Sequence, residues 1–323
     1  MKTTGDYPTI NERPPEGRKD DGTSFRVLVV DDSMFVAKQL GQILTSEGYE
    51  VVATAADGKE GVDKYKELCP NIDLVTMDIT MPKMDGIELL RQLRRENISA
   101  RIMMASTITM NGARVTLDAL ELGALDFIHK PEWSFKCKDD SFSDQLLRTL
   151  DSVCKAKLEA RPTGRNVQVK VEQQTTKVEE LVRKNAAKVT GNRLVAIAIS
   201  TGGPKSLQSV LPFLPDDLNA PVVIVQHMPV GFTASLAERM NSISKIKVVE
   251  AQEGDVLTKG CVYIAKGGSH LNLIKTPGGT KVHYTDEPTR EGVKPCANYM
   301  YESLMDSDYA EITCAVLTGM GAD

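Results

Sequence analysis

The chain has 323 residues, 41% of them hydrophobic, and a formal net charge of -5 at pH 7. This length suits two domains of ordinary size, each able to bury its own core. The acidic balance argues against nucleic acid as the main partner, because phosphate binding needs concentrated Lys and Arg.

No apolar run is long enough to span a bilayer, so we expect no direct membrane insertion. The first residues also lack the hydrophobic segment of a secretory signal. The six cysteines show no close pairs, which predicts neither a zinc site nor a disulfide framework. We therefore expect a cytoplasmic protein in a reducing environment.

The N-terminal half alternates between short apolar runs and segments of helical period. Residues 1–23 are rich in Pro, Gly and charge, and we predict that they form a flexible lead. Residues 24–150 are predicted to be a doubly wound parallel α/β domain of five strands. The five runs are RVLVV, VVATA, IDLVTM, RIMMAS and LDFIH. Strand signals vanish over residues 151–192, which we interpret as a helix tail and a solvated linker.

Strand signals return over residues 193–323, which predicts a second, C-terminal parallel α/β domain. The apolar runs are LVAIAIS, VVIVQ, KVVEA, CVYIA and ITCAVLT. The segment NLIKTPGGTKVHY has PGG between two short alternating runs, which predicts a hairpin on the edge of this sheet.

Charged residues follow three strands of the first predicted domain. Asp31 and Asp32 come after RVLVV, Asp78 comes after IDLVTM, and Lys130 comes after LDFIH. Because the carboxyl ends of parallel strands converge, we expect the acids to lie together. Clustered carboxylates favour Mg²⁺, and a metal-bound Asp78 would be a nucleophile toward a phosphoryl group. The alternative is that each acid is an ordinary strand-end or helix-capping residue.

These positions form a motif set that resembles the response regulator receiver domain: DD, an acceptor Asp followed by MPKMDG, a hydroxyl at residue 106, and HKP at 129–131. The resemblance implies that Mg²⁺ is held by Asp31, Asp32 and Asp78. It implies that Asp78 accepts phosphate from a sensor histidine kinase and that Lys130 contacts the phosphate. Ser106 and Phe127 would be the switch pair that follows phosphorylation.

Three strand ends of the second domain carry a candidate nucleophile, base and acid. Ser200 lies between LVAIAI and TGGP, His227 follows VVIVQ, and Asp323 ends AVLTGMGAD. Glycines and a helix N-terminus beside Ser200 would offer tight geometry and anion-stabilising N–H groups. Together the three residues meet the requirement for activating a serine. Each also has an ordinary interpretation: a turn or cap for Ser200, a structural role for His227, and a phosphate cradle for STGGP.

The segments AISTGGP, VQHMP, GGSHLNL and LTGMGAD together resemble the catalytic domain of chemotaxis protein-glutamate methylesterases, which carry a receiver domain at the N-terminus. The resemblance implies that Ser200 is the nucleophile, His227 the general base and Asp323 the residue that orients the imidazole. Thr201 would lie beside the nucleophile, and Met320 would offer a backbone N–H to the oxyanion hole.

The implied reaction is hydrolysis of glutamate methyl esters on methyl-accepting chemoreceptors, with release of methanol and without a cofactor in the catalytic domain. Phosphorylation of the receiver by the chemotaxis histidine kinase would activate it, and receptor glutamines would be deamidated by the same chemistry. The alternative is a catalytically silent regulator that binds receptor or kinase and acts as a phosphate sink. A transcription factor is disfavoured, since the output half has no basic recognition helix.

The sequence departs from the family pattern in two places. Cys296 and Asn298 stand where the family has Ser and Asp in a PSVD-like segment. Family members also continue beyond the position of Asp323, so we expect the catalytic domain in this sequence to be incomplete at its C-terminus.

Overall fold

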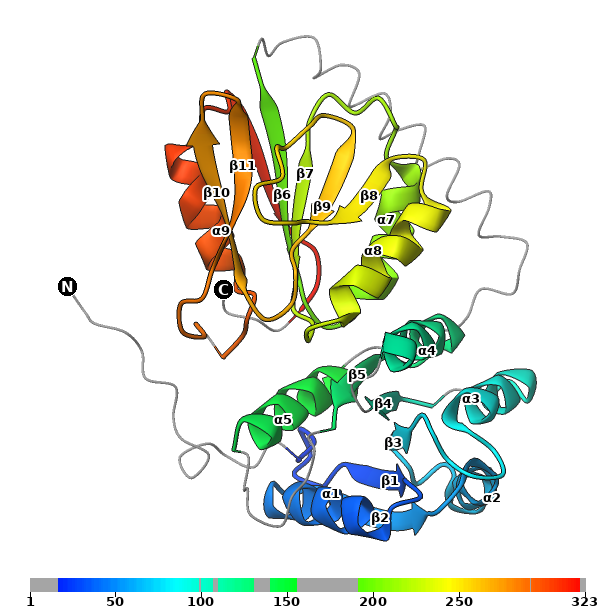
Figure 1. The fold of residues 1–323 in the computed structure, drawn as a ribbon. Helices are drawn as coiled ribbons and strands as arrows, with labels where there is room; N and C mark the ends of the chain where they lie inside the picture. The colour runs from blue at the N-terminus through cyan, green and yellow to red at the C-terminus, as the bar shows by residue number, and fades with distance from the viewer. Residues whose placement is uncertain are drawn as a thin grey trace, which may run out of the picture. The chain divides into compact units, whose positions relative to one another are not determined.

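The computed structural model describes residues 17–98, 100–106, 110–130, 140–155, 191–290 and 292–319. The chain divides into two compact units, of which the first holds strands β1 to β5 and the second holds β6 to β12 (Figure 1). Both sets of predicted strands are present, and the predicted α/β class is confirmed. Residues 1–16 of the predicted lead and 156–190 of the predicted linker lie outside the described residues.

The N-terminal unit is a doubly wound parallel sheet with the strand order β2-β1-β3-β4-β5. Its elements are β1 (Arg26–Val30), α1 (Met34–Ser46), β2 (Glu50–Ala55), α2 (Gly58–Leu68), β3 (Leu74–Asp78), α3 (Gly86–Arg95), β4 (Ile102–Ser106), α4 (Met110–Leu122), β5 (Asp126–His129) and α5 (Asp140–Lys155). The chain order reverses between β1 and β3. In such sheets ligands bind in the crevice at the carboxyl ends of the strands on either side of that reversal.

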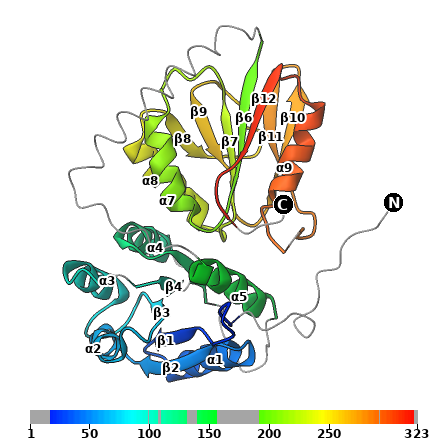
Figure 2. The same cartoon turned by 180° about the vertical axis from the view of Figure 1, so that it is seen from behind.

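Side chains of β1 are buried on both faces, which explains why its sequence is an unbroken apolar run. Val27 and Val29 pack in one cluster with residues of α1 and α5, such as Leu40 and Leu146. Figure 2 shows α1 and α5 on the same side of this sheet. Each of the first three helices begins at a side-chain cap that accepts a backbone N–H. The caps are Ser33 for α1, Asp57 for α2 and Asp85 for α3.

Residues 17–25 form a turn that packs against the N-terminal unit, although the sequence suggested a flexible lead through residue 23. Gly17 N–H donates to the carbonyl of Glu47, and Phe25 N–H donates to the carbonyl of Gly17. Lys19 Nζ lies 2.8 Å from Asp73 Oδ2. These contacts attach the segment to the end of α1 and to the loop before β3, so part of the predicted lead packs against this unit.

The C-terminal unit contains a five-stranded parallel sheet with the order β12-β6-β7-β9-β8. Its elements are β6 (Arg193–Ile199), α7 (Gly203–Val210), the 3₁₀ helix η2 (Leu211–Phe213), β7 (Val222–Gln226), α8 (Phe232–Ile243), β8 (Lys247–Glu250), β9 (Cys261–Ile264), β10 (His270–Thr276), β11 (Gly279–Thr285), α9 (Ala297–Ser303), the 3₁₀ helix η3 (Leu304–Asp306) and β12 (Glu311–Val316). Strands β7 and β9 are entirely buried, as expected for the middle of a parallel sheet.

The predicted hairpin exists as β10 and β11, but it is a separate two-stranded sheet and does not extend the edge of the main sheet. Its apolar residues Leu271, Leu273 and Val282 pack in one cluster with Ala196 and with Met300 of α9. Alternation of apolar and polar residues therefore gave the hairpin one buried face, which packs as a layer on the sheet. Helices α7 and α8 lie on the other side of the sheet (Figures 1 and 2).

None of the helices in the described ranges combines the length and the hydrophobicity of a membrane span.

Candidate functional sites

Two sites can be built from the described residues, one at the carboxyl ends of the strands in each unit. In the N-terminal unit, single carboxylate oxygens of Asp31, Asp32 and Asp78 lie within 4.8 Å of one another. Lys130, which follows β5, places its Nζ 2.6 Å from Asp31 Oδ2 and 2.6 Å from Asp78 Oδ2. The predicted convergence of Asp31, Asp32, Asp78 and Lys130 is therefore present.

Burial gives this cluster its electrostatic character. Asp31 is 3% exposed and Lys130 is 5% exposed, so both charges are removed from water. Burial raises the pKa of Asp31 above its ordinary value, and the ammonium of Lys130 opposes that rise. Asp31 and Asp78 share the ammonium of Lys130, and together with the nearby Asp32 they form an electron-rich oxygen donor set. Such a set fits a hard divalent ion such as Mg²⁺.

Backbone amides orient the carboxylate of Asp78. Its Oδ1 accepts the N–H of Ile79 at 2.7 Å, while its Oδ2 contacts Lys130. Gly86 lies beneath the carbonyl of Asp78, and a Cβ on Gly86 would be 2.3 Å from that oxygen. The Gly of the MPKMDG motif is thus required by close packing against the backbone of the candidate acceptor.

A contact that the sequence did not reveal holds the loop after Asp78. Lys83 Nζ lies 2.6 Å from Oδ2 of Asp57, the buried cap of α2. Lys83 has a φ of 62°, an uncommon conformation for a residue other than glycine. The two residues are far apart in the sequence and follow no periodic pattern, so only the fold brings them together.

The predicted switch residues lie on neighbouring strands. Ser106 ends β4 and Phe127 is the second residue of β5, where it pairs in register with Met104. Phe127 is buried, with 8% of its surface exposed. The side chain of Ser106 lies outside the described residues, so its partnership with Phe127 stays a prediction.

Ser200 occupies the predicted turn between β6 and α7. Its carbonyl accepts the N–H of Gly203 at 2.8 Å, which closes a four-residue turn. Gly202 has a φ of +72°, which this turn requires and which glycine adopts without strain. Ser200 and Thr201 are both half-buried. A hydroxyl at this position combines partial exposure with the neighbourhood of a helix N-terminus, the end of a helix that favours negative charge.

His227 directly follows β7, the neighbour of β6. Ile199 and Gln226 are partners in register, so the next residues along each strand, Ser200 and His227, leave the sheet side by side. The N–H of His227 also donates to the carbonyl of Ile199 at 3.2 Å. The sheet therefore brings the candidate nucleophile and the candidate base to adjacent positions.

Strand β12 pairs with β6 on the side opposite β7, and Leu317 N–H donates to the carbonyl of Ala198. The chain thus leaves β12 beside the turn that holds Ser200. Met320 and Asp323 follow shortly afterwards, but both lie outside the described residues. Their predicted roles stay predictions.

The segment that departs from the family pattern is packed into the unit. Cys296 is fully buried and precedes α9, and its backbone N–H donates to Nδ1 of His270 at 3.1 Å. Nε2 of the same ring lies 3.1 Å from the carbonyl of Pro288. A neutral His270 satisfies both contacts, and burial lowers its pKa. His270 had no evident role in the sequence.

Comparisons with known proteins agree with this division. Residues 27–136 match the response regulator receiver domain family, and residues 195–323 match the CheB methylesterase family. A protein-glutamate methylesterase/protein-glutamine glutaminase of Bacillus subtilis (strain 168) is 40% identical over 300 residues, which cover 93% of this chain and 83% of the relative. A protein of the same name from Archaeoglobus fulgidus is 39% identical over 299 residues, which cover 93% of this chain and 82% of that relative. The crystal structure of the Thermotoga maritima CheB methylesterase catalytic domain is 39% identical, with a TM-score of 0.39, and covers 42% of this chain and 71% of that one.

A receiver domain followed by a methylesterase domain defines an enzyme of the response regulator class. The chain belongs to the family of protein-glutamate methylesterases/protein-glutamine glutaminases. The resemblance inferred from the motifs is confirmed at the level of the family.

Proposed function

We propose that this enzyme hydrolyses methyl esters of glutamate side chains on the cytoplasmic domains of chemoreceptors, and that phosphorylation of its receiver domain activates it. The observation that carries the proposal is the side-by-side exit of Ser200 and His227 from neighbouring parallel strands. Membership of the methylesterase family supplies the chemistry that this pair would perform. Such a reaction on receptors would serve chemotactic adaptation.

In the proposed reaction, the Ser200 oxygen attacks the ester carbonyl while His227 accepts the hydroxyl proton. The tetrahedral oxyanion is stabilised by backbone amides at the start of α7 and by the N–H of Met320. Collapse of the intermediate breaks the bond to the methoxy group, which leaves as methanol with the proton from His227. Water, deprotonated by His227, then attacks the acyl-serine; the bond to the Ser200 oxygen breaks, that oxygen takes the proton back from His227, and glutamate is released. Asp323 is proposed to orient the imidazole, and Thr201 to flank the nucleophile.

Deamidation of receptor glutamines follows the same path, with ammonia as the leaving group in place of methanol. Both reactions pass through a tetrahedral oxyanion on the same carbonyl carbon. The two activities are therefore expected to need the same Ser200 and His227.

For the receiver, we propose that Asp78 accepts a phosphoryl group from a histidine kinase. Its position at the strand ends, beside Lys130 and two further carboxylates, supports that role. Asp31, Asp32 and Asp78 would hold Mg²⁺, which when bound neutralises carboxylate and phosphoryl oxygens. Lys130 would then contact the phosphate, and Ser106 and Phe127 would respond to it. Receptor, kinase and enzyme would meet in the cytoplasm, without insertion of this chain into the membrane.

Methanol release from a carboxyl-methylated receptor fragment tests the catalytic half of the proposal. We expect the full chain to release methanol, and expect Ser200→Ala and His227→Gln to lose at least about 1,000-fold in kcat, as in other serine hydrolases. Receptor binding should persist in both variants. If Ser200→Ala releases methanol at the wild-type rate, the assignment of the nucleophile is wrong. A wild-type chain that takes up phosphate but releases no methanol would be a silent regulator.

A further inference from the structure

The turn that follows His227 rests on a second loop, residues 266–268, between β9 and β10. A Cβ on Gly267 would lie 2.7 Å from the carbonyl oxygen of Met228 and 2.6 Å from that of Pro229. A Cβ on Gly268 would lie 2.4 Å from Cγ2 of Val230. A side chain at residue 267 would collide with two backbone carbonyls, and Gly268 has a φ of +84°, so glycine is required or favoured at both positions where this loop lies against the residues after His227.

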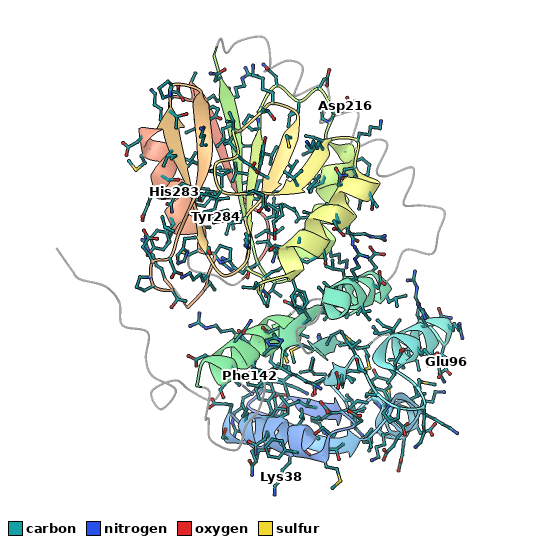
Figure 3. The ribbon with its side chains drawn as sticks, in the orientation of Figure 1. Lys38, Glu96, Phe142, Asp216, His283 and Tyr284 are labelled. Atoms are coloured by element: carbon teal, nitrogen blue, oxygen red, sulfur yellow. The ribbon has the colours of Figure 1, made fainter. Side chains whose placement is uncertain are left out.

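The loop is itself fixed by three successive backbone amides, each bonded to a different part of the unit. Lys266 N–H donates to the hydroxyl of Tyr284 at 2.8 Å. Gly267 N–H donates to Oγ1 of Thr233 at 3.1 Å. Gly268 N–H approaches the carbonyl of Lys294 at 3.4 Å. Tyr284 is on β11 (Figure 3) and Thr233 is in the first turn of α8, so the loop is held from several directions.

The bond to Thr233 is the one in which a side chain links the loop to the helix that follows His227. Thr233 is fully buried, and its hydroxyl donates to Oε1 of Glu250, at the end of β8, at 2.6 Å. Because the proton of the hydroxyl points to the carboxylate, its lone pair faces the N–H of Gly267. A hydrogen bond to a carboxylate is shorter and stronger than one between neutral groups. The link therefore fixes α8, β8 and the loop at one point.

The same helix continues the turn that carries His227. The carbonyl of Pro229 accepts the N–H of Phe232 at 3.3 Å, which closes the turn onto the start of α8. Thr233, the next residue, then connects that start to the loop that packs beneath Met228 and Pro229. The turn after His227 is thus held between its own helix and the loop.

We infer that Thr233 and Gly267 are positioning residues of the methylesterase, which hold the His227 turn against the 266–268 loop and so keep the imidazole at the hydroxyl of Ser200. This inference rests on the proposed role of His227 as general base. Both residues are buried. Their effect on catalysis passes through the backbone of residues 227–230, and a small displacement of a catalytic group is enough to slow a reaction strongly.

Three substitutions at one position isolate the hydroxyl. Thr233→Val replaces the hydroxyl with a methyl group and keeps the shape of the side chain. Thr233→Ala removes both the hydroxyl and the methyl group, and Thr233→Ser removes only the methyl group, so it is the matched control for Ala. With the full-length chain and a carboxyl-methylated receptor fragment, we expect kcat to fall on the order of 10- to 100-fold in the Val and Ala variants, with KM unchanged. The Ser variant should retain most of the wild-type kcat. The acidic limb of the pH profile of kcat should move in the Val variant and not in the Ser variant.

A purely structural role would lower the unfolding temperature and leave kcat and its pH profile unchanged in the protein that remains folded. Folded Thr233→Val or Thr233→Ala protein with wild-type kcat would overturn the inference. His227→Gln is the reference variant. If it keeps activity, the proposed function fails; if it is inactive while Thr233→Val is active, only the positioning inference fails.

Amide hydrogen exchange in the wild-type chain gives a test that needs no variant. The N–H of Gly267 is expected to exchange as slowly as the amides in the middle of β7, because Thr233 holds it. Rapid exchange at Gly267 would show that the loop is not fixed, and would overturn the inference even if every variant at Thr233 failed to fold.

Discussion

Replacing Lys130 with Met should strongly destabilise the N-terminal unit, because it removes the cation shared by the buried carboxylate of Asp31 and the half-buried carboxylate of Asp78. Each contact of Nζ with Asp31 and Asp78 spans 2.6 Å, and Coulomb's law at an effective dielectric of about 20 gives about 6 kcal/mol for one such contact. Desolvation of the buried ions offsets much of that attraction. The cost of leaving the carboxylates unpaired is about 3 to 5 kcal/mol, as for other buried pairs that lose one partner.

Native-state hydrogen exchange suits this prediction, because exchange of the amides in β1 and β3 reports on the stability of the N-terminal unit separately from that of the C-terminal unit. Lys83→Met is the matched control, since Lys83 also lies 2.6 Å from a carboxylate but has a side chain that is 72% exposed. We expect a smaller change there, because the ammonium of Lys83 lies in solvent even though Asp57 is buried. Added Mg²⁺ should recover part of the stability of the Lys130 variant. If Lys130→Met unfolds with a free energy within about 1 kcal/mol of the wild type, the account of the buried cluster is wrong.

Three further predictions concern other parts of the chain. Gly86→Ala should destabilise the N-terminal unit by about 1 to 3 kcal/mol and slow phosphate uptake, since the new methyl group would displace the carbonyl of Asp78; unchanged labelling by a phosphodonor would contradict this. Chelation of divalent ions should abolish phosphate uptake by Asp78 and leave basal methanol release unaltered, measured with the same donor and substrate. Burial lowers the pKa of His270 below its ordinary value of 6.5. As the pH falls, this histidine is therefore protonated at a higher pH in the unfolded chain than in the folded chain. Stability of the C-terminal unit should therefore be full above pH 6.5 and decline as the pH falls below it. In His270→Gln, which can still accept from Cys296 and donate to Pro288, thermal unfolding should depend less on pH between 7 and 5.5; an equal dependence would refute the assignment.

Much of the fold could be predicted from the sequence because parallel strands buried on both faces appear as continuous apolar runs. The strand LVTMD ends at Asp78, and this alone placed the acid at the carboxyl edge of the sheet. The same logic placed Ser200 and His227 at adjacent strand ends, because β6 and β7 follow one another in the chain and pair.

Contacts between residues without a shared periodicity could not be predicted. The bond of Thr233 to Gly267 joins residues 34 positions apart, and the pair of Asp57 and Lys83 joins residues 26 apart. The residues around each member of such a pair do not indicate its partner, because the contact depends on how helices and loops pack in the folded chain. The hairpin was misplaced for a related reason. Alternation shows that one face is buried, but it does not distinguish an edge strand from a separate layer.

Methanol release from a carboxyl-methylated receptor fragment, measured with and without a small-molecule phosphodonor, tests the central claim most directly. We predict that the donor raises the rate in the wild-type chain, and that the ratio of the two rates falls to unity in Asp78→Asn. A phosphoryl group can act in this way only if it favours one of two states of the enzyme. Stimulation that persists in Asp78→Asn, or a wild-type rate that does not respond to the donor although Asp78 is phosphorylated, would contradict the account.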